Sequence, residues 1–568
     1  MHAPRFDIGW FLAVLFIASA GADAVAEDVT LLRAREGAAA LMRGQYDKAI
    51  ASYDEALSNP EIADFIEASI YSDRGVAKWR LNQTKEAIED FNQSIQLSPE
   101  NATVYNNRGN ALMDLGHPDE AVKDFDRAIA LSPNYGPAYN NRGNARVALG
   151  QYNLAFQDFR KAVERMPQSA VPFNGRGTAH AELKRYHAAV RDLSRAIALN
   201  TKYVAAYRHR ADAYLALGLY REAVADATEV LTLEPDTPNP ELLLLRARAY
   251  AGDKKLNQAL DDLNKVIEEK PELVDAYIER GTVFIGARRF DDAIGDLTRA
   301  LELDPRNAKA FATRATAKLQ AEAKDDALYD VNQALQIASN DAFALRVRGN
   351  VYEALERPDD AITDYRSALA QDPFQTESRE ALQRLAQEVP AEEGRTLSEP
   401  VAGWVIKEPQ PGRYIASNPK YPAVRTELEM FGTGQPKILE WKLLKDALSG
   451  IGLLKYYAGD FGDGEASSLE YVAIVDTRAN KVISVEPHSW GPAAAQWNWQ
   501  AVSVVVTDPD GNANEIQLRK VKQRAPTQRD DFWGFERPDA GAATEGRRAR
   551  RGGGGESGGG SMFNWLFH

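Results

Sequence analysis

A period of 34 residues constrains this chain more than any other feature of its sequence. The phrases YNNRGNALMDLG and YNNRGNARVALG, each followed by an amphipathic stretch, recur at that spacing, and ten units carry a small residue followed twelve positions later by an alanine. The small residues are Gly37, Gly75, Gly109, Gly143, Gly177, Ala211, Ala247, Gly281, Ala315 and Gly349. Such a period predicts a repeat architecture in which each unit is one supersecondary element.

Each unit is predicted to be a hairpin of two antiparallel helices. Helices approach closely where side chains are small, and a large apolar residue four positions after the alanine, such as Phe91 or Phe125, fills the remaining gap. One hairpin exposes an apolar face that only its neighbour covers, so stability accumulates along the array. This pattern, from Leu31 to Pro373, resembles the tetratricopeptide repeat family. We expect a mainly α-helical solenoid over residues 31–388, closed by a polar capping helix at 377–388.

An arginine precedes the small residue in nine consecutive units, and an aspartate follows each arginine by sixteen residues. The first unit has Glu36 and Ser52 instead, so it lacks both partners together. Pairing within a hairpin leaves no charge stranded at either end of the array, whereas pairing with the next hairpin would strand Arg74 and Asp364. We therefore predict a structural ladder of ion pairs, in preference to a basic stripe that binds an anionic ligand.

The resemblance implies that the first helices line a concave groove that holds an extended peptide or protein. Asparagine amides offer a donor and an acceptor together, so a row of them suits a peptide backbone. Arginines further along suggest an acidic or carboxylate feature in the partner. The predicted groove residues are Asn106, Asn107, Asn110, Asn140, Asn141, Asn144, Asn174, Arg208, His209, Arg248 and Arg346. The alternative is that these residues form solvated helix faces.

The pattern changes from helix to strand after a predicted linker at 389–402. Residues 471–476 and 481–486 flank one short turn, and residues 501–507 and 515–520 flank another, which are hairpin signatures. We expect a small, mainly antiparallel β domain over residues 403–522, with a helix around 443–456. Trp497 and Trp499 share one strand face, where they either stack on a sugar or, more commonly, fill the core.

A disordered Arg/Gly-rich tail is predicted for residues 523–568. It ends in an apolar peptide, and an apolar peptide on a flexible tether is typical of a docking segment. We expect this segment to contact a partner protein, a membrane protein or the membrane surface. Its apolar residues are Phe563, Trp565, Leu566 and Phe567.

The N-terminus has the layout of a secretory signal peptide at residues 1–26. An apolar run from Ile8 to Ala20 leads to the small-residue sequence Ala24-Val25-Ala26, after which we expect cleavage, although an uncleaved anchor is the alternative. The chain contains no cysteine, so stability after export must come from packing alone. The expected location is the bacterial periplasm or the extracellular space.

The composition favours protein partners. A formal net charge of −14 argues against a general nucleic-acid binder, which needs a surplus of Lys and Arg. The seven histidines are scattered without metal-ligand spacing, and we expect no catalytic residues, no metal and no cofactor. The predicted function is a non-enzymatic scaffold that binds a partner peptide or protein in its groove. The alternative is a cell-envelope glycan-binding protein or enzyme whose activity resides in the β domain.

Overall fold

The computed structural model describes residues 29–518, apart from 60–61, 236–238, 374, 386–394, 398–399, 411–412, 422–424, 431–433, 445–447, 461–467, 480, 491–492, 501–502 and 509–512. The predicted signal peptide and the tail, with its docking segment Phe563, Trp565, Leu566 and Phe567, lie outside these residues. The chain forms two compact units. One extends to Ala179 and includes Arg195–Thr201, and the other comprises His180–Ser194 and the chain from Lys202 onward.

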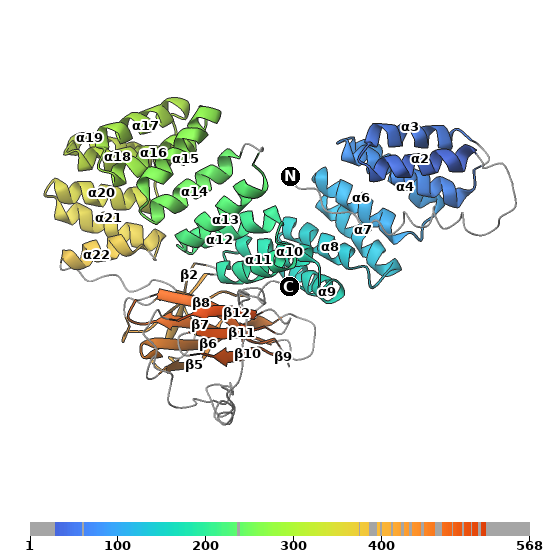
Figure 1. Ribbon diagram of the computed structural model, residues 1–568. Helices are drawn as coiled ribbons and strands as arrows, with labels where there is room; N and C mark the ends of the chain where they lie inside the picture. Colours follow the sequence, from blue (N-terminus) through green and yellow to red (C-terminus); the bar gives the residue numbers. More distant parts are fainter. Residues whose placement is uncertain are drawn as a thin grey trace, which may run out of the picture. The chain divides into compact units, whose positions relative to one another are not determined.

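Antiparallel helix pairs form the first part of the described chain, which confirms the predicted solenoid of hairpins (Figure 1). The first helices of the hairpins are α2 (Val29–Met42), α4 (Asp64–Arg80), α6 (Ala102–Asp114), α8 (Gly136–Ala148), α10 (Ala170–Glu182), α12 (Val204–Ala216), α14 (Pro240–Gly252), α16 (Val274–Gly286), α18 (Ala308–Gln320) and α20 (Ala342–Ala354). The second helices are α3 (Tyr46–Leu57), α5 (Thr84–Leu97), α7 (Pro118–Leu131), α9 (Tyr152–Arg165), α11 (Tyr186–Leu199), α13 (Tyr220–Leu233), α15 (Leu256–Glu269), α17 (Phe290–Leu303), α19 (Lys324–Ile337) and α21 (Pro358–Gln371). The capping helix is α22 (Thr376–Arg384).

The small residue of the repeat is required by the packing inside each hairpin. In the third hairpin, a β-carbon at Gly109 would lie 2.6 Å from Cε1 of Phe125, which is fully buried in α7. The helices are joined by a tight turn that contains a residue in the left-handed region, such as Gly116 (φ 78°). The aromatic ring therefore occupies the space that the missing side chain leaves.

The predicted Arg–Asp ion pair is described in eight of the nine hairpins whose sequence contains both residues. In the third hairpin, Nε and Nη2 of Arg108 donate to the two carboxylate oxygens of Asp124 over 2.8 and 2.6 Å. The structure adds a contact that the sequence did not predict, because Nη1 of Arg108 donates to Asn92 of the preceding hairpin over 2.7 Å. The prediction for Arg176 and Asp192, which belong to different compact units, stays a prediction.

The other seven described pairs repeat this arrangement. Each arginine also contacts a residue on the second helix of the preceding hairpin. The pairs are Arg74–Asp90, Arg142–Asp158, Arg210–Asp226, Arg246–Asp262, Arg280–Asp296, Arg314–Asp330 and Arg348–Asp364. The preceding-hairpin contacts are to Asp54, Asp126, Ser194, Thr228, Asn264, Thr298 and Asn332, respectively. The ladder thus joins neighbouring hairpins as well as the two helices of one hairpin.

The C-terminal part of the second unit is a small domain of antiparallel sheets, as predicted. A four-stranded sheet contains β1 (Arg395–Thr396), β2 (Val405–Gln410), β3 (Arg413–Ser417) and β4 (Arg425–Glu427). A five-stranded sheet contains β5 (Lys437–Leu443), β6 (Ile451–Asp460), β7 (Ser468–Asp476), β8 (Lys481–Trp490) and β9 (Ala493–Ala494). A three-stranded sheet contains β10 (Gln496–Trp499), β11 (Ser503–Thr507) and β12 (Ala513–Gln517).

The five-stranded sheet is buried on both faces. Alternate residues of β6 and β7, such as Tyr456 and Ala473, pack with the four-stranded sheet around Trp404. The intervening residues, such as Leu453 and Ile474, pack with the three-stranded sheet. Three layers with two apolar cores result.

One prediction for this region is wrong. Residues 443–456 contain the end of β5 and the start of β6 instead of a helix. A strand buried on both faces carries a continuous apolar run, and such a run cannot be distinguished from a buried helix by periodicity. Within the predicted linker at 389–402, Arg395 and Thr396 form β1 and pair with β2, and the bounds of the linker stay a prediction.

Candidate functional site

The first helices form the wall on which the predicted groove residues lie. Within each unit, successive first helices contact one another, from α2 to α8 in one unit and from α12 to α20 in the other. We call the surface that these helices form the inner wall. On the first unit's inner wall, Asn106, Asn107, Asn110, Asn140 and Asn141 are buried, Asn174 is partly buried and Asn144 is exposed. Most of these amides therefore face the neighbouring helix instead of open solvent.

Three of the buried asparagines form a chain of amide hydrogen bonds. Nδ2 of Asn140 donates to Oδ1 of Asn141 over 3.2 Å, and Nδ2 of Asn141 donates to Oδ1 of Asn106 over 2.9 Å. These hydrogen bonds link α8 to α6 and orient each amide. This arrangement brings the predicted asparagines together, and their role in binding stays a prediction.

The predicted cationic residues of the second unit are largely matched by carboxylates. Arg248 Nε lies 3.0 Å from Glu279, which also pairs with Lys309 at 3.0 Å, and Arg208 Nη2 lies 3.9 Å from Glu234. These contacts leave little uncompensated positive charge for an acidic partner on α12 and α14.

The remaining two predicted residues of this set have different surroundings. The guanidinium of Arg346 lies over the Phe343 ring, 5.2 Å from its centroid. Burial lowers the pKa of His209, and the nearby charge of Arg208 lowers it further. His209 is therefore neutral near pH 7, and it adds no charge to the inner wall.

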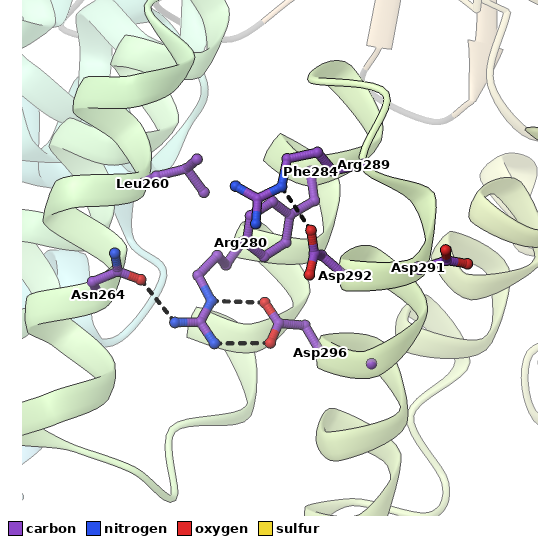
Figure 2. A pocket seen from close by; sticks show the side chains of 9 residues that line it. Leu260, Asn264, Arg280, Phe284, Arg289, Asp291, Asp292 and Asp296 are labelled. Carbon is purple, nitrogen blue, oxygen red and sulfur yellow. Dashed lines mark hydrogen bonds and ion pairs between the residues drawn. The ribbon is translucent and has the colours of Figure 1, made fainter.

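A depression of about 480 Å³ lies between α15, α16 and α17 (Figure 2). Arg280 donates through Nε and Nη2 to Asp296 over 2.7 and 2.8 Å, and Arg289 pairs with Asp292 at 2.6 Å. Gly295 widens the depression because it has no side chain. Since both lining guanidiniums already have a carboxylate, we assign the depression to the packing of hairpins and not to a ligand site.

Sequence reasoning missed a polar cluster where the fifth hairpin meets the β domain inside the second unit. Ala188 of α11 belongs to the same buried core as Trp404 and Tyr471. Arg191 Nη2 donates to the carbonyl oxygen of Val485 over 3.0 Å, and its Nε lies 3.4 Å from Oε2 of Glu486. One face of α11 thus packs against the β domain.

The ionisable groups of this cluster respond strongly to burial. Desolvation raises the pKa of Glu429 to about 8, against the opposing effect of Arg191 and Arg185, and its Oε1 accepts from the backbone N–H of His187 over 3.4 Å. Desolvation lowers the pKa of His187 to about 4 and that of Arg185 to about 10. Glu486 is held by Asn514 Nδ2, over 2.9 Å, and by the Ser484 hydroxyl.

The sequence contains a signal for the contact between α11 and the β domain. It lies at the residue directly before the alanine that recurs in each hairpin. In the fifth hairpin it is Ala188, which is 1% exposed. In the other hairpins it is larger and mostly charged or polar: Lys48, Glu86, Glu120, Leu154, Glu222, Gln258, Asp292, Asp326 and Asp360. A single small residue on an otherwise polar face indicates that something covers that face.

Other chemistry is sparse in the described part of the chain. It contains no group of three or more His, Asp or Glu side chains that could hold a metal ion. None of its helices combines the length and apolar character needed to cross a bilayer. Trp497 and Trp499 are 4% and 8% exposed with their rings 6.0 Å apart, which confirms that they belong to the core.

Models of the tetratricopeptide repeat match residues 75–116, 102–135, 136–169, 174–236, 210–273 and 278–343. These ranges fall between residues 75 and 343, a stretch that runs from the second to the ninth hairpin. The hairpins that they cover are tetratricopeptide repeats. The arrays of this family support a protein–protein interaction scaffold, because stacked repeats create extended surfaces for recognition. A search of curated proteins finds no match.

Solved tetratricopeptide structures resemble parts of the chain. Yeast Tom70 is 14% identical, with 63% of this chain and 95% of Tom70 covered and a TM-score of 0.34. YrrB, a TPR protein with an unusual peptide-binding site, is 25% identical, with 33% and 96% covered and a TM-score of 0.29. PilW, a type IV pilus biogenesis factor, is 16% identical, with 36% and 94% covered and a TM-score of 0.34.

Proposed function

We propose that this chain is a scaffold that binds an extended segment of a partner protein on the inner wall of its third to fifth tetratricopeptide repeats. The observation that carries the proposal is the amide chain of Asn140, Asn141 and Asn106, whose members hold one another in fixed orientations. These buried hydrogen bonds fix the packing of α8 on α6, so the exposed amide of Asn144 on α8 is presented from a rigid wall and can pair with a peptide backbone. The first unit's inner wall is favoured over that of the second unit, since Arg208 and Arg248 there already have carboxylate partners.

Site-specific photo-crosslinking tests this proposal. A benzophenone amino acid replaces Asn144, which is exposed on α8, or Asn153, which is exposed on α9 of the same hairpin. We expect partner adducts from position 144 and none from position 153, because only the first helices form the inner wall. Equal adducts from both positions, or adducts from position 153 alone, would contradict the proposal.

We also propose that the scaffold is exported and that its tail makes a second contact. The apolar run Ile8 to Ala20 followed by Ala24-Val25-Ala26 supports export. Residues 1–35 fused to a phosphatase that is active only outside the cytoplasm should give an active enzyme. An inactive fusion would exclude export.

The contact made by the tail is tested by truncation after Gly560, which removes Phe563 and Trp565. The truncated protein should associate more weakly with the partner or the membrane. Unchanged association would exclude a role for the tail.

The glycan-binding alternative receives no support from the two tryptophans that motivated it. Trp497 and Trp499 lie in the core between the five-stranded and three-stranded sheets. A buried indole cannot stack on a sugar without disrupting that core.

A further inference from the structure

Asp73 on α4 is a carboxylate of the first unit's inner wall that has no cationic partner among the described residues. It lies two residues before the small residue Gly75 and is partly exposed. The hydroxyl of Tyr53 donates to its Oδ2 over 3.4 Å. Desolvation raises the pKa of Asp73 to about 7, and only this hydrogen bond opposes the effect. A desolvated carboxylate without a counter-charge is unfavourable, so the fold retains this charge at a cost.

The same position of another repeat shows what such a carboxylate binds when its partners are present. Glu279 also lies two residues before the small residue of its hairpin, Gly281. It contacts Nε of Arg248 and Nζ of Lys309, each over 3.0 Å. Arg248 directly follows the small residue of the preceding hairpin, and Lys309 lies six residues before that of the following hairpin. Two cations thus converge on a carboxylate at this position.

Neither of these cations has an equivalent around Asp73. Ala38 directly follows the small residue of the preceding hairpin, and Thr103 lies six residues before that of the following hairpin. Both side chains are uncharged. Asp73, Ala38 and Thr103 are each partly exposed, so solvent reaches the carboxylate and the two positions from which cations approach Glu279. We call Asp73, Ala38 and Thr103 together the Asp73 site.

The chemistry of the Asp73 site selects a basic side chain. An ammonium or guanidinium donates to the carboxylate and supplies the missing charge. A neutral donor would leave that charge uncompensated, and an acidic group would be repelled. The aliphatic stem of a lysine or arginine can also cover an apolar surface such as Ala38. A segment that covers the site excludes water, which strengthens the attraction between the two charges.

We propose that Asp73 binds a lysine or arginine side chain of the partner segment that occupies the inner wall. The proposal rests on the proposed function, because the segment must extend from the third repeat to the second. Their first helices, α6 and α4, contact each other within the first unit. The equivalent residues of the neighbouring hairpins are Arg35 and Asn107, so the preference for a cation is confined to one place. It therefore also fixes the register of the bound segment.

Peptide selection tests the ligand side on the full-length chain. Random peptides displayed on phage are selected against the protein, and the recovered peptides are synthesised and titrated by fluorescence anisotropy. We expect a Lys or Arg at one fixed position. Replacing that Lys with norleucine, or that Arg with citrulline, removes the charge and should weaken binding about 10-fold at low salt. The loss should be smaller at high salt, which screens the pair.

The protein side is tested by Asp73→Asn, which removes the charge and keeps an acceptor for the Tyr53 hydroxyl. It should weaken binding of the basic peptide about 10-fold and abolish the effect of the norleucine replacement. The matched control is Glu89→Gln, an exposed carboxylate on α5 of the same hairpin, which should change neither. Asp73→Asn should also keep or raise the thermal unfolding midpoint at pH 8, because it removes an uncompensated charge. A purely structural carboxylate requires the opposite, a lower midpoint.

The outcomes separate this proposal from the proposed function. Peptides that crosslink at position 144 without a Lys or Arg preference overturn the proposal for Asp73 and leave the scaffold function standing. A norleucine effect of equal size in wild type and in Asp73→Asn also overturns it. If deletion of residues 523–568 tightens peptide binding in wild type but not in Asp73→Asn, the occupant is the chain's own arginine-containing tail and not a partner. Failure to recover any peptide, together with no crosslinking at position 144, overturns the inner-wall function itself.

Discussion

Arg142 and Asp158 form a two-bond ion pair across the fourth hairpin, with Nη2–Oδ1 and Nε–Oδ2 distances of 2.5 and 3.0 Å. The same arginine donates through Nη1 to Asp126 of the third hairpin over 2.6 Å. The Asp158 side chain is 3% exposed and also accepts from Nη1 of Arg146 over 2.7 Å, whereas the Asp126 side chain is 51% exposed. One arginine therefore provides a comparison of a buried and an exposed partner.

Asp158→Ala should lower the free energy of unfolding by about 3–5 kcal/mol, because it leaves the largely buried guanidinium of Arg142 without its main partner. Asp126→Ala should cost at most about 1 kcal/mol, as is typical of exposed pairs. Urea titration followed by circular dichroism measures both. Equal effects of the two substitutions would show that burial does not control the strength of the ladder.

Arg191→Ala should destabilise the β domain by about 3–5 kcal/mol, because it leaves the buried carboxylate of Glu486 without a counter-charge. The control is Lys123→Ala, which removes an exposed cation at the same helical position of the third hairpin and should change stability by less than about 0.5 kcal/mol. Near-ultraviolet circular dichroism of the buried tryptophans reports the unfolding. An Arg191→Ala protein as stable as the control would mean that α11 does not hold the β domain.

The pKa of Glu429, raised to about 8 by burial, makes stability depend on pH. The folded protein holds a proton there that the unfolded chain releases above pH 4.5, so this group's contribution is present below pH 4.5 and is lost as pH rises through about 8. Glu429→Gln, which mimics the protonated acid, should remove that part of the decline. Thermal unfolding at pH 6.0 and 8.5 measures the difference. The exposed control Glu427→Gln should lose as much stability between these pH values as wild type. A Glu429→Gln variant that loses as much stability as wild type or the control would contradict the assignment.

Gly109 and Phe125 should show compensating effects when both are changed. Gly109→Ala places a methyl group where Cε1 of Phe125 would be 2.6 Å away, and such overpacking costs about 1–3 kcal/mol. Adding Phe125→Val to that variant gives the pair found naturally in the ninth hairpin, Ala315 with Val331. The double mutant should lose less stability than the sum of the two single mutants in urea titration. Strict additivity would mean that the ring and the glycine do not share space.

The sequence by itself determined the helical array. Small residues, alanines and Arg–Asp pairs recur at fixed spacing because each hairpin repeats the same internal contacts, and contacts between residues sixteen apart leave a readable pattern. The ion pair of Arg280 and Asp296 could therefore be predicted without coordinates. The double-sided burial of β6 could not, because periodicity does not distinguish a strand that is apolar on both faces from a helix.

Only the tertiary structure decided which surfaces are covered. The backbone N–H of His187 meets Glu429 across 242 residues of sequence, and Arg191 meets Val485 across 294. Neither contact recurs in another hairpin, so no period could reveal it. The burial of Asn140 and Asn141 likewise depends on how closely successive first helices pack. Repetition encodes contacts between neighbours, whereas a contact made once between distant segments depends on the folded arrangement of the chain.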